Sequence, residues 1–224
     1  MEVLPGLYRV PIPETNGNAY VLVRGGKAIV IDTGIPGKAS VIVEEVVRAG
    51  LSPRSVESIV LTHFHLDHSG SADELRRLTG ARIYIHVADS PFLEGLQPPP
   101  LPSQAPREAV EAYRYFKPVK PDGLLRDGDL INGLRVIHVP GHTPGSIALY
   151  DGRLLFSGDT INVREGKVVG PPPAYTTNMD EAIRSLRRLL SLEFDVLLPG
   201  HGPPIVGGAR GRALQDLKDV LGEA

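Results

Sequence analysis

The first part of the chain alternates short apolar runs with one amphipathic segment. The apolar runs cover residues 7–12, 20–23 and 28–31. A Gly25-Gly26 pair separates the last two runs, as in the tight turn of an antiparallel hairpin. Residues 38–49 then carry apolar side chains at helical spacing and stop at Gly50, a residue type that commonly ends helices. We therefore predict antiparallel strands followed by a helix.

The middle of the chain continues with a strand, a polar loop and a helix. The apolar run from Ser58 leads into the segment HFHLDHSG, and residues 72–78 have a helical pattern. Residues 82–87 predict another strand. Prolines are then frequent in residues 88–122. Because proline interrupts regular structure, we interpret this segment as a cap insertion with one short helix over 106–116.

The second half of the chain predicts hairpins, a helix and a last strand. Short apolar runs cover residues 129–131, 134–139, 146–150 and 153–156. Two pairs typical of hairpin turns join them, Asn132-Gly133 and Asp151-Gly152. Residues 179–190 have an amphipathic pattern that Asn178 would cap. Residues 195–198 predict the last strand before a PGHG segment.

Both halves of the chain share one order of elements. Each runs from antiparallel strands to a helix and then to a strand that ends at a polar loop, and IVIDTG at 29–34 resembles LFSGDT at 155–160. Such a layout suits an α/β (α+β) fold in which two sheets pack together with helices outside. A length of 224 residues is within the range of one domain. We therefore predict a single domain over 1–224 that carries the cap insertion.

Composition excludes several classes of function. The net charge of -2 and the lack of any run of Lys or Arg argue against a nucleic-acid partner. No apolar stretch is long enough for a membrane span or a secretory leader, so we expect a cytoplasmic protein. The 21 prolines and the few Asn, Gln and Met residues are typical of heat-adapted, thermophile proteins. Because the chain has no cysteine, any metal must be bound through nitrogen and oxygen.

The strongest chemical signal follows a predicted strand directly. It is the segment His63-Phe64-His65-Leu66-Asp67-His68. In a strand, residues 63, 65 and 67 would share one face, and a change to helix near Ser69 would turn His68 toward the same side. A polar loop with ordinary histidines is the alternative, but this density of ligand-type residues favours a metal site.

Three further ligand-type residues lie on glycine-rich loops. They are His142 in PGHTPGS, Asp159 in SGDT and His201 in PGHG. Glycine lets the backbone bend sharply and approach an ion closely. With the first segment, these loops supply five histidines and two aspartates. That sum fits two cations of four to five ligands each when one carboxylate bridges them.

The segments THFHLDH, GHTPGS, SGDT and PGHG, in this order, resemble the metallo-β-lactamase superfamily, most closely its glyoxalase-II-like hydrolases. The resemblance implies the αββα four-layer sandwich, with the metals at the edge where the two sheets meet. It assigns His63, His65 and His142 to one metal, Asp67, His68 and His201 to the other, and Asp159 to both. Asp32 in IDTG would steady the ligand loop by hydrogen bonds, and capping of its own turn is the alternative role.

The resemblance also implies a mechanism. Two divalent cations, zinc first with iron or manganese as alternatives, would share a hydroxide that attacks a small ester-like substrate. Asp67 would touch the attacking water and carry its proton. Thioesters are favoured, while lactones and phosphodiesters stay open. The short stretch after His201 leaves no room for the helical extension that holds glutathione in that branch, which weakens the case for glutathione thioesters.

Other functions within the superfamily compete with this interpretation. Asp159 as a bridge is typical of the hydrolases rather than of the antibiotic-degrading β-lactamases, and the cysteine ligand of some of those is absent here. A mononuclear iron dioxygenase acting on sulfur compounds uses many of the same ligands and stays open. A metal-binding module without activity is less consistent with an open, water-bearing site.

Four other side chains carry weaker signals. His86 and His138 lie in predicted strands, where packing is their expected role. Tyr113 in the cap and Tyr175 after PPPA would contact the substrate or else pack under a loop. The expected partner is a small-molecule substrate. The oligomeric state stays open, a homodimer included.

Overall fold

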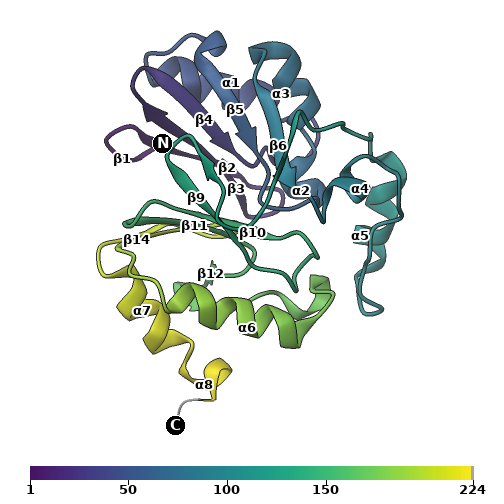
Figure 1. Ribbon diagram of the computed structural model, residues 1–224, viewed down its shortest axis with the longest axis vertical. Helices are drawn as coiled ribbons and strands as arrows, with labels where there is room; N and C mark the ends of the chain where they lie inside the picture. Colours follow the sequence, from purple (N-terminus) through teal and green to yellow (C-terminus); the bar gives the residue numbers. More distant parts are fainter. Residues whose placement is uncertain (223–224) are drawn as a thin grey trace. The chain divides into compact units, whose positions relative to one another are not determined.

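The computed structural model describes residues 1–222, apart from the side chains of Ala109 and Tyr115, and it forms two compact units. The first consists of Met1–Pro98 and Glu111–Leu125, and the second of Pro99–Val110 and the chain from Arg126 onward. Figure 1 shows the elements coloured along the sequence. Within residues 1–222, none of the helices is long and apolar enough to cross a membrane.

The first unit contains a seven-stranded mixed sheet in the order β1 to β7. Its strands are β1 (Glu2–Leu4), β2 (Leu7–Ile12), β3 (Gly17–Arg24), β4 (Lys27–Ile31), β5 (Val56–Val60), β6 (Arg82–His86) and β7 (Gly123–Leu125). Strands β1 to β4 pair antiparallel, which confirms the predicted opening, and β4 to β7 pair parallel. The parallel strands therefore all end at one edge of this sheet.

Two helices, α1 and α3, lie side by side and pack on this sheet (Figure 1). The helices before β7 are α1 (Ala39–Arg48), η1 (Pro53–Ser55), α2 (Leu66–Ser69), α3 (Ala72–Thr79), α4 (Ser90–Leu93), α5 (Arg107–Ala112) and η2 (Tyr113–Tyr115). Ile42 of α1 and Leu75 of α3 are buried in one apolar cluster with Val30 and Ile59 of the sheet. Burial of each such side chain contributes about 1.5–3 kcal/mol, so this face of the sheet stabilises the first unit.

The second unit contains a six-stranded mixed sheet in the order β15-β14-β11-β10-β9-β8 and a two-stranded sheet of β12 and β13. The strands are β8 (Leu130–Ile131), β9 (Leu134–His138), β10 (Ile147–Tyr150), β11 (Leu154–Gly158), β12 (Asn162–Arg164), β13 (Lys167–Val169), β14 (Val196–Pro199) and β15 (Ile205–Val206). Strands β8 to β11 form the predicted antiparallel hairpins. Strands β11 and β14 pair parallel, so both end at the same edge.

Helix α6 packs on the second sheet through its apolar face. The helices of this unit are η3 (Pro173–Tyr175), α6 (Met179–Leu190), α7 (Ala209–Asp216) and α8 (Lys218–Leu221). The side chain of Asn178 accepts a hydrogen bond from the backbone N–H of Glu181 at 3.1 Å, which confirms the predicted N-cap. Leu186 and Leu189 of α6 are buried in one cluster with Leu155 of β11.

Three expectations from the sequence are wrong in detail. The strand predicted to run into the histidine segment ends at Val60, and α2 begins at Leu66, so strand alternation does not arrange residues 63, 65 and 67. The proline-rich segment contains helix α4 with Pro91 in its first turn, where the missing N–H of proline costs no hydrogen bond. After His201, where the sequence predicted no element, the chain forms β15, α7 and α8.

Candidate metal centre

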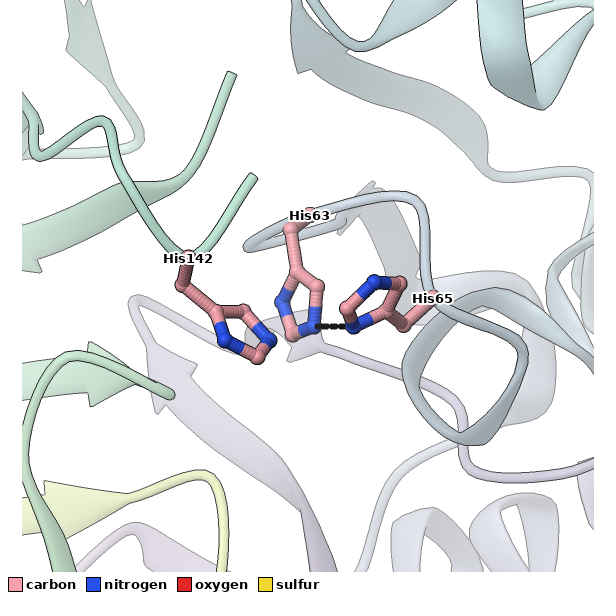
Figure 2. Close-up of side chains that lie close together, drawn as sticks. All are labelled: His63, His65 and His142. Atoms are coloured by element: carbon pink, nitrogen blue, oxygen red, sulfur yellow. Dashed lines mark hydrogen bonds between the residues drawn. The ribbon is translucent and has the colours of Figure 1, made fainter. Parts of the chain in front are cut away.

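The histidine segment of the first unit lies where the chain leaves β5 and enters α2. His63, His65 and His68 are 0%, 7% and 1% exposed. The Nε2 atom of His63 lies 3.1 Å from the Nδ1 atom of His65 (Figure 2). Metal–nitrogen bonds to zinc are about 2.0–2.1 Å long, so two nitrogens at this separation can bind the same ion.

Asp67 and His68, in α2, extend this group of side chains. The Nε2 atom of His68 lies 3.7 Å from Oδ2 of Asp67, and the ring centroids of His63 and His68 are 4.1 Å apart. We call His63, His65, Asp67 and His68 the first-unit cluster. The side chain of Asp67 is 29% exposed, compared with 1% for His68. Asp67 is therefore the member of this cluster that is most exposed to solvent.

Asp32 anchors the histidine segment from a neighbouring strand end. Asp32 follows β4 and Thr62 follows β5, and these strands are parallel neighbours. Oδ1 of Asp32 accepts the backbone N–H of Thr62 at 2.7 Å, and Oδ2 accepts the Thr62 hydroxyl at 2.8 Å and Nδ1–H of His68 at 2.9 Å. Of the two roles that the sequence left open for Asp32, these contacts match the anchoring role.

A second buried aspartate, Asp89, supports the same segment and was not predicted from the sequence. Asp89 is 0% exposed, and its Oδ2 accepts the backbone N–H of Phe64 at 3.0 Å. The hydroxyl of Ser69 donates to the carbonyl of Phe64 at 2.8 Å. Asp89 follows β6, the neighbour of β5 in the sheet. This placement was the available signal, but aspartates are common in loops of every kind.

The second unit brings together His142, Asp159 and His201, which we call the second-unit cluster. Asp159 follows β11 and His201 follows β14, which are parallel neighbours, and His142 lies between β9 and β10. The Oδ2 atom of Asp159 lies 3.4 Å from Nε2 of His142 and 3.3 Å from Nε2 of His201. One carboxylate oxygen of Asp159 therefore lies at nearly equal distances from two imidazole nitrogens.

Gly200 makes room for this carboxylate. A Cβ atom at Gly200 would lie 2.3 Å from Oδ1 of Asp159, which is too close for any side chain. Gly141, before His142, has φ +124, and a Cβ there would lie 2.2 Å from the backbone nitrogen of Ala182 in α6. The loops can take these paths only because both positions are glycine.

Two further residues that the sequence did not indicate contact the second-unit cluster. The Oδ1 atom of Asn162 accepts the backbone N–H of His201 at 2.8 Å. The hydroxyl of Thr176 lies 3.1 Å from Nδ1 of His142 and donates to the carbonyl of Pro172 at 2.8 Å. The cluster is therefore held by side chains from β12 and from the segment after η3.

Tyr113 and Tyr175, the predicted substrate residues, lie in different surroundings. The ring centroid of Tyr113 is 6.2 Å from that of Phe64 in the first unit. Burial, with the nearby carboxylates of Asp67 and Asp89, raises the pKa of Tyr113 well above its usual value, so its hydroxyl stays protonated at neutral pH. Tyr175 ends η3 and is 40% exposed. Contact with a substrate stays a prediction for both tyrosines.

His86 and His138 make local contacts of the kind expected of packed residues. Nδ1 of His86, at the end of β6, accepts the backbone N–H of Ala88 at 3.3 Å. Nε2 of His138, at the end of β9, donates to the carbonyl of Pro144 at 2.9 Å. Each ring is tied to a neighbouring backbone group of its own unit.

The donor chemistry of both clusters fits divalent metal ions. They are metal-binding clusters of histidine and aspartate, with nitrogen and oxygen donors and no thiolate, since the chain has no cysteine. Imidazole and carboxylate ligands suit zinc, iron and manganese alike. Gly200 leaves the space that the Asp159 carboxylate occupies, which agrees with a carboxylate held in place for an ion.

Comparison with known proteins gives consistent similarities. A family model described as "Metallo-beta-lactamase superfamily" matches residues 12–201. "Probable metallo-hydrolase YflN" of Bacillus subtilis (strain 168) is 31% identical over 205 residues, 80% of this chain and 76% of that protein. "Acyl-coenzyme A thioesterase MBLAC2" of Gallus gallus is 31% identical over 208 residues, 80% of this chain and 70% of that protein. The crystal structure of TTHA1623 in a di-iron-bound form is 30% identical with a TM-score of 0.71, covering 92% of this chain and 98% of that one.

Proposed function

Because this chain belongs to the metallo-β-lactamase superfamily and is a metal-dependent hydrolase, we propose a set of metal ligands, a role for the neighbouring residues and a class of substrate. The two mixed sheets with their helices are the fold of that family, so the predicted fold class is confirmed. The matched range, 12–201, includes all seven predicted ligands.

In this proposal the two clusters together would hold two divalent cations, with zinc the first candidate. One cation would be held by His63, His65 and His142, the other by Asp67, His68 and His201, and Asp159 would be shared by both. The position of Asp159 carries this proposal, because one of its carboxylate oxygens approaches two imidazole nitrogens at 3.4 and 3.3 Å. The di-iron-bound form of TTHA1623 supports a set of two ions.

The residues around the ions set where the reaction takes place. Two bound cations lower the pKa of a water molecule toward 7 and polarise the substrate. Asp67, the most open member of the first-unit cluster, accepts the proton of the attacking water. Asp32 and Asp89 hold the segment that carries Asp67 through their bonds to Thr62, His68 and Phe64. A fixed segment keeps the Asp67 carboxylate within reach of the reacting atoms.

A small thioester is the favoured substrate. The Gallus gallus relative is named as an acyl-coenzyme A thioesterase, which supports this class, as does the resemblance of the motifs to glyoxalase-II-like hydrolases. A thiolate is also a good leaving group. Lactones and phosphodiesters are the next candidates, because the same chemistry serves carbonyl and phosphoryl centres.

A substrate panel with defined metals tests this proposal. Metal-free protein is loaded with zinc, iron or manganese and assayed on thioesters, lactones, phosphodiesters and β-lactams. We expect thioester turnover with two ions per chain. The variants H63A and D159A should lose about 100-fold or more, because several kcal/mol of charge stabilisation are lost. The control H138A, outside both clusters, should keep its activity.

Three results would contradict the proposed function. They are no turnover on the whole panel, full activity in H63A and D159A, and activity with a single bound ion. One iron per chain with uptake of oxygen would assign the protein to the dioxygenases instead.

A further inference from the structure

The hydroxyl of Thr62 links Asp32 to His63. It lies 2.8 Å from Oδ2 of Asp32 and 3.0 Å from Nδ1 of His63. A threonine hydroxyl has one hydrogen, and an ionised carboxylate only accepts, so that hydrogen points to Asp32. The contact with His63 is then a hydrogen bond only if Nδ1 of the ring carries a hydrogen and donates it to the Thr62 oxygen. The Nε2 atom of His63 is left with its lone pair.

The hydroxyl of Thr176 makes the same arrangement in the second unit. It donates to the carbonyl of Pro172 at 2.8 Å and lies 3.1 Å from Nδ1 of His142. A carbonyl oxygen also only accepts, so the ring of His142 must donate from Nδ1. Both threonines are 2% exposed, and water therefore does not compete for these bonds.

We propose that Thr62 and Thr176 are positioning residues that hold His63 and His142 in the tautomer with hydrogen on Nδ1. The inference rests on the proposed function in one respect, which is that Nε2 of both rings binds the same cation. A neutral imidazole binds a metal through the nitrogen that lacks hydrogen. Each threonine thus keeps hydrogen off Nε2 of its histidine and holds the histidine ring in the orientation that binds the ion.

The contact between His63 and His65 shows why this control is needed. Nε2 of His63 and Nδ1 of His65 are 3.1 Å apart, and a hydrogen bond between two imidazoles can run in either direction. With Thr62 in place, His63 must be the acceptor. Without the hydroxyl, His63 is free to place its hydrogen on Nε2, the form that free histidine prefers, and to donate to His65 instead. That form places the hydrogen on Nε2 of His63, the nitrogen that would bind the ion.

The direct partner of His68 supports the same logic. Oδ2 of Asp32 accepts from Nδ1 of His68 at 2.9 Å, so in the neutral ring Nε2 carries no hydrogen. The buried carboxylate of Asp32 therefore fixes one ring directly and a second ring through Thr62. In the second unit, the backbone carbonyl of Pro172 accepts the hydrogen of the Thr176 hydroxyl, as the carboxylate of Asp32 accepts that of Thr62 in the first unit.

Nitrogen-15 NMR of the metal-free protein measures the tautomers directly. Long-range proton–nitrogen spectra at pH 8.5 show which nitrogen of each neutral imidazole ring carries hydrogen. We expect hydrogen on Nδ1 of both rings in the parent. T62V should shift His63 and T176V should shift His142 toward hydrogen on Nε2. T62S and T176S, which keep the hydroxyl, should retain the parent tautomers.

Thr79 offers a matched control for the loss of a buried hydroxyl. It is also 2% exposed, and its hydroxyl donates to the carbonyl of Leu75 at 2.7 Å in α3. T79V therefore has a cost in stability of the same kind as T62V, yet it contacts neither cluster. Both tautomers should be unchanged in T79V.

Zinc titration against a competing chelator gives a second readout. T62V and T176V should each weaken one of the two zinc equivalents by roughly 10–100-fold, the usual effect of losing a partner of a ligand. T62S, T176S and T79V should bind both equivalents like the parent. If T62V does not fold, T176V alone decides, because it tests the same relay in the other unit.

The inference is overturned by hydrogen on Nε2 of His63 or His142 in the parent, by Thr→Val variants with unchanged tautomers, or by equal weakening of both zinc equivalents. None of these measurements uses a substrate. A parent protein with the expected tautomers and two bound zinc ions that hydrolyses nothing on the panel would contradict the proposed substrate class and leave this inference standing.

Discussion

Asp32 is the residue through which the end of β4 controls the histidine segment. Its carboxylate accepts hydrogen bonds from the backbone and the hydroxyl of Thr62 and from the ring of His68. Hydrogen bonds to a charged group contribute about 1.5–3 kcal/mol each, and Asp32 is 2% exposed. A single buried charge therefore orients side chains that belong to both proposed ions.

Asp32→Asn removes the negative charge of the side chain and leaves the backbone conformation unchanged. Asp32 has φ +58, a conformation that asparagine adopts as readily as aspartate, so the variant adds no strain. An amide has one acceptor atom where the carboxylate has two, and it cannot serve Thr62 and His68 equally. We expect affinity for both zinc equivalents to fall by roughly 10–100-fold, measured by chelator competition.

The control for this prediction is Asp127→Asn on the surface of the second unit. Asp127 pairs with Arg188 at 2.9 Å, and both side chains are about half exposed, at 47% and 49%. Loss of such a pair changes stability by about 1 kcal/mol or less, and zinc affinity should stay at the parent value. Unchanged zinc affinity in Asp32→Asn itself would show that the charge of Asp32 does not support metal binding.

The proposed metal ligands and the residues that hold those ligands in place differ in how readily they can be identified from the sequence. The predicted ligands stand out because histidine, aspartate and glycine lie within a few positions of one another. The positioning residues do not, because each depends on a partner that is remote along the chain: Thr62 meets Asp32 30 positions away, Thr176 meets His142 34 positions away, and Asp89 meets Phe64 25 positions away. Threonine and aspartate are common in loops, so only the folded chain identifies them.

At the scale of elements, the clusters depend on where parallel strands end. Strands β4, β5 and β6 bring Asp32, the histidine segment and Asp89 to one edge of their sheet, and β11 and β14 bring Asp159 and His201 to one edge of theirs. The turn after β14 must leave space for the carboxylate that follows β11. Gly200 provides this space.

Gly200→Ala tests the space beside Asp159. Its Cβ would lie 2.3 Å from Oδ1 of Asp159, so either the turn or the carboxylate must move. A shift of about 1 Å in a reacting group can cost about 100-fold in rate, and overpacking costs about 1–3 kcal/mol of stability. We expect both losses, measured as turnover of the best substrate and as the free energy of unfolding.

Gly211 is the matched control in the same unit. It lies in α7, and a Cβ there meets no atom within 4 Å. Gly211→Ala should stabilise the protein by roughly 0.5–1 kcal/mol through the better helix propensity of alanine and leave turnover unchanged. Parent-like turnover in Gly200→Ala would mean that the loop accommodates a methyl group without moving Asp159.

The pattern of the sequence predicted elements best where large apolar side chains carry the period. The strand 7–12 and the helix 179–190 have the predicted bounds. Helix α7 was missed because its buried residues are the small Ala209 and Ala213, which give little amphipathic contrast. The strand before the histidine segment was predicted too long, because Leu61 is as apolar as the strand residues but lies beyond the end of β5 at Val60.

At the scale of the whole molecule, the order of the motifs predicted the family and the fold class. The motifs are spread along most of the chain, within the range 12–201 that the family model matches. Each unit has a hydrophobic cluster of its own, and each supplies part of the proposed ligand set. The shared order of elements in the two halves predicted two sheets but not the bounds of this division, because those depend on which strands pair. The proposed ions therefore take ligands from two separately stabilised parts of the chain.

Metal binding should stabilise the chain as a whole under this proposal. An ion at 100 times its Kd adds about 2.7 kcal/mol, which corresponds to roughly 5–10 °C in Tm for a protein of this size. H63A removes a first-unit ligand and H142A a second-unit ligand of the same ion. Each variant should lose the same part of the zinc-dependent increase in Tm, measured by calorimetry with and without a chelator.

The double variant H63A/H142A distinguishes a shared ion from separate ones. If both histidines bind one ion, the second substitution removes nothing further from the zinc-dependent stability, and the two effects are not additive. If each unit bound its own ion, the two losses would be independent and would add. Because both single variants also lose packing, the comparison uses only the difference between zinc-loaded and chelated protein, in which packing losses cancel. Additive losses would therefore refute the ligand set that joins the two units.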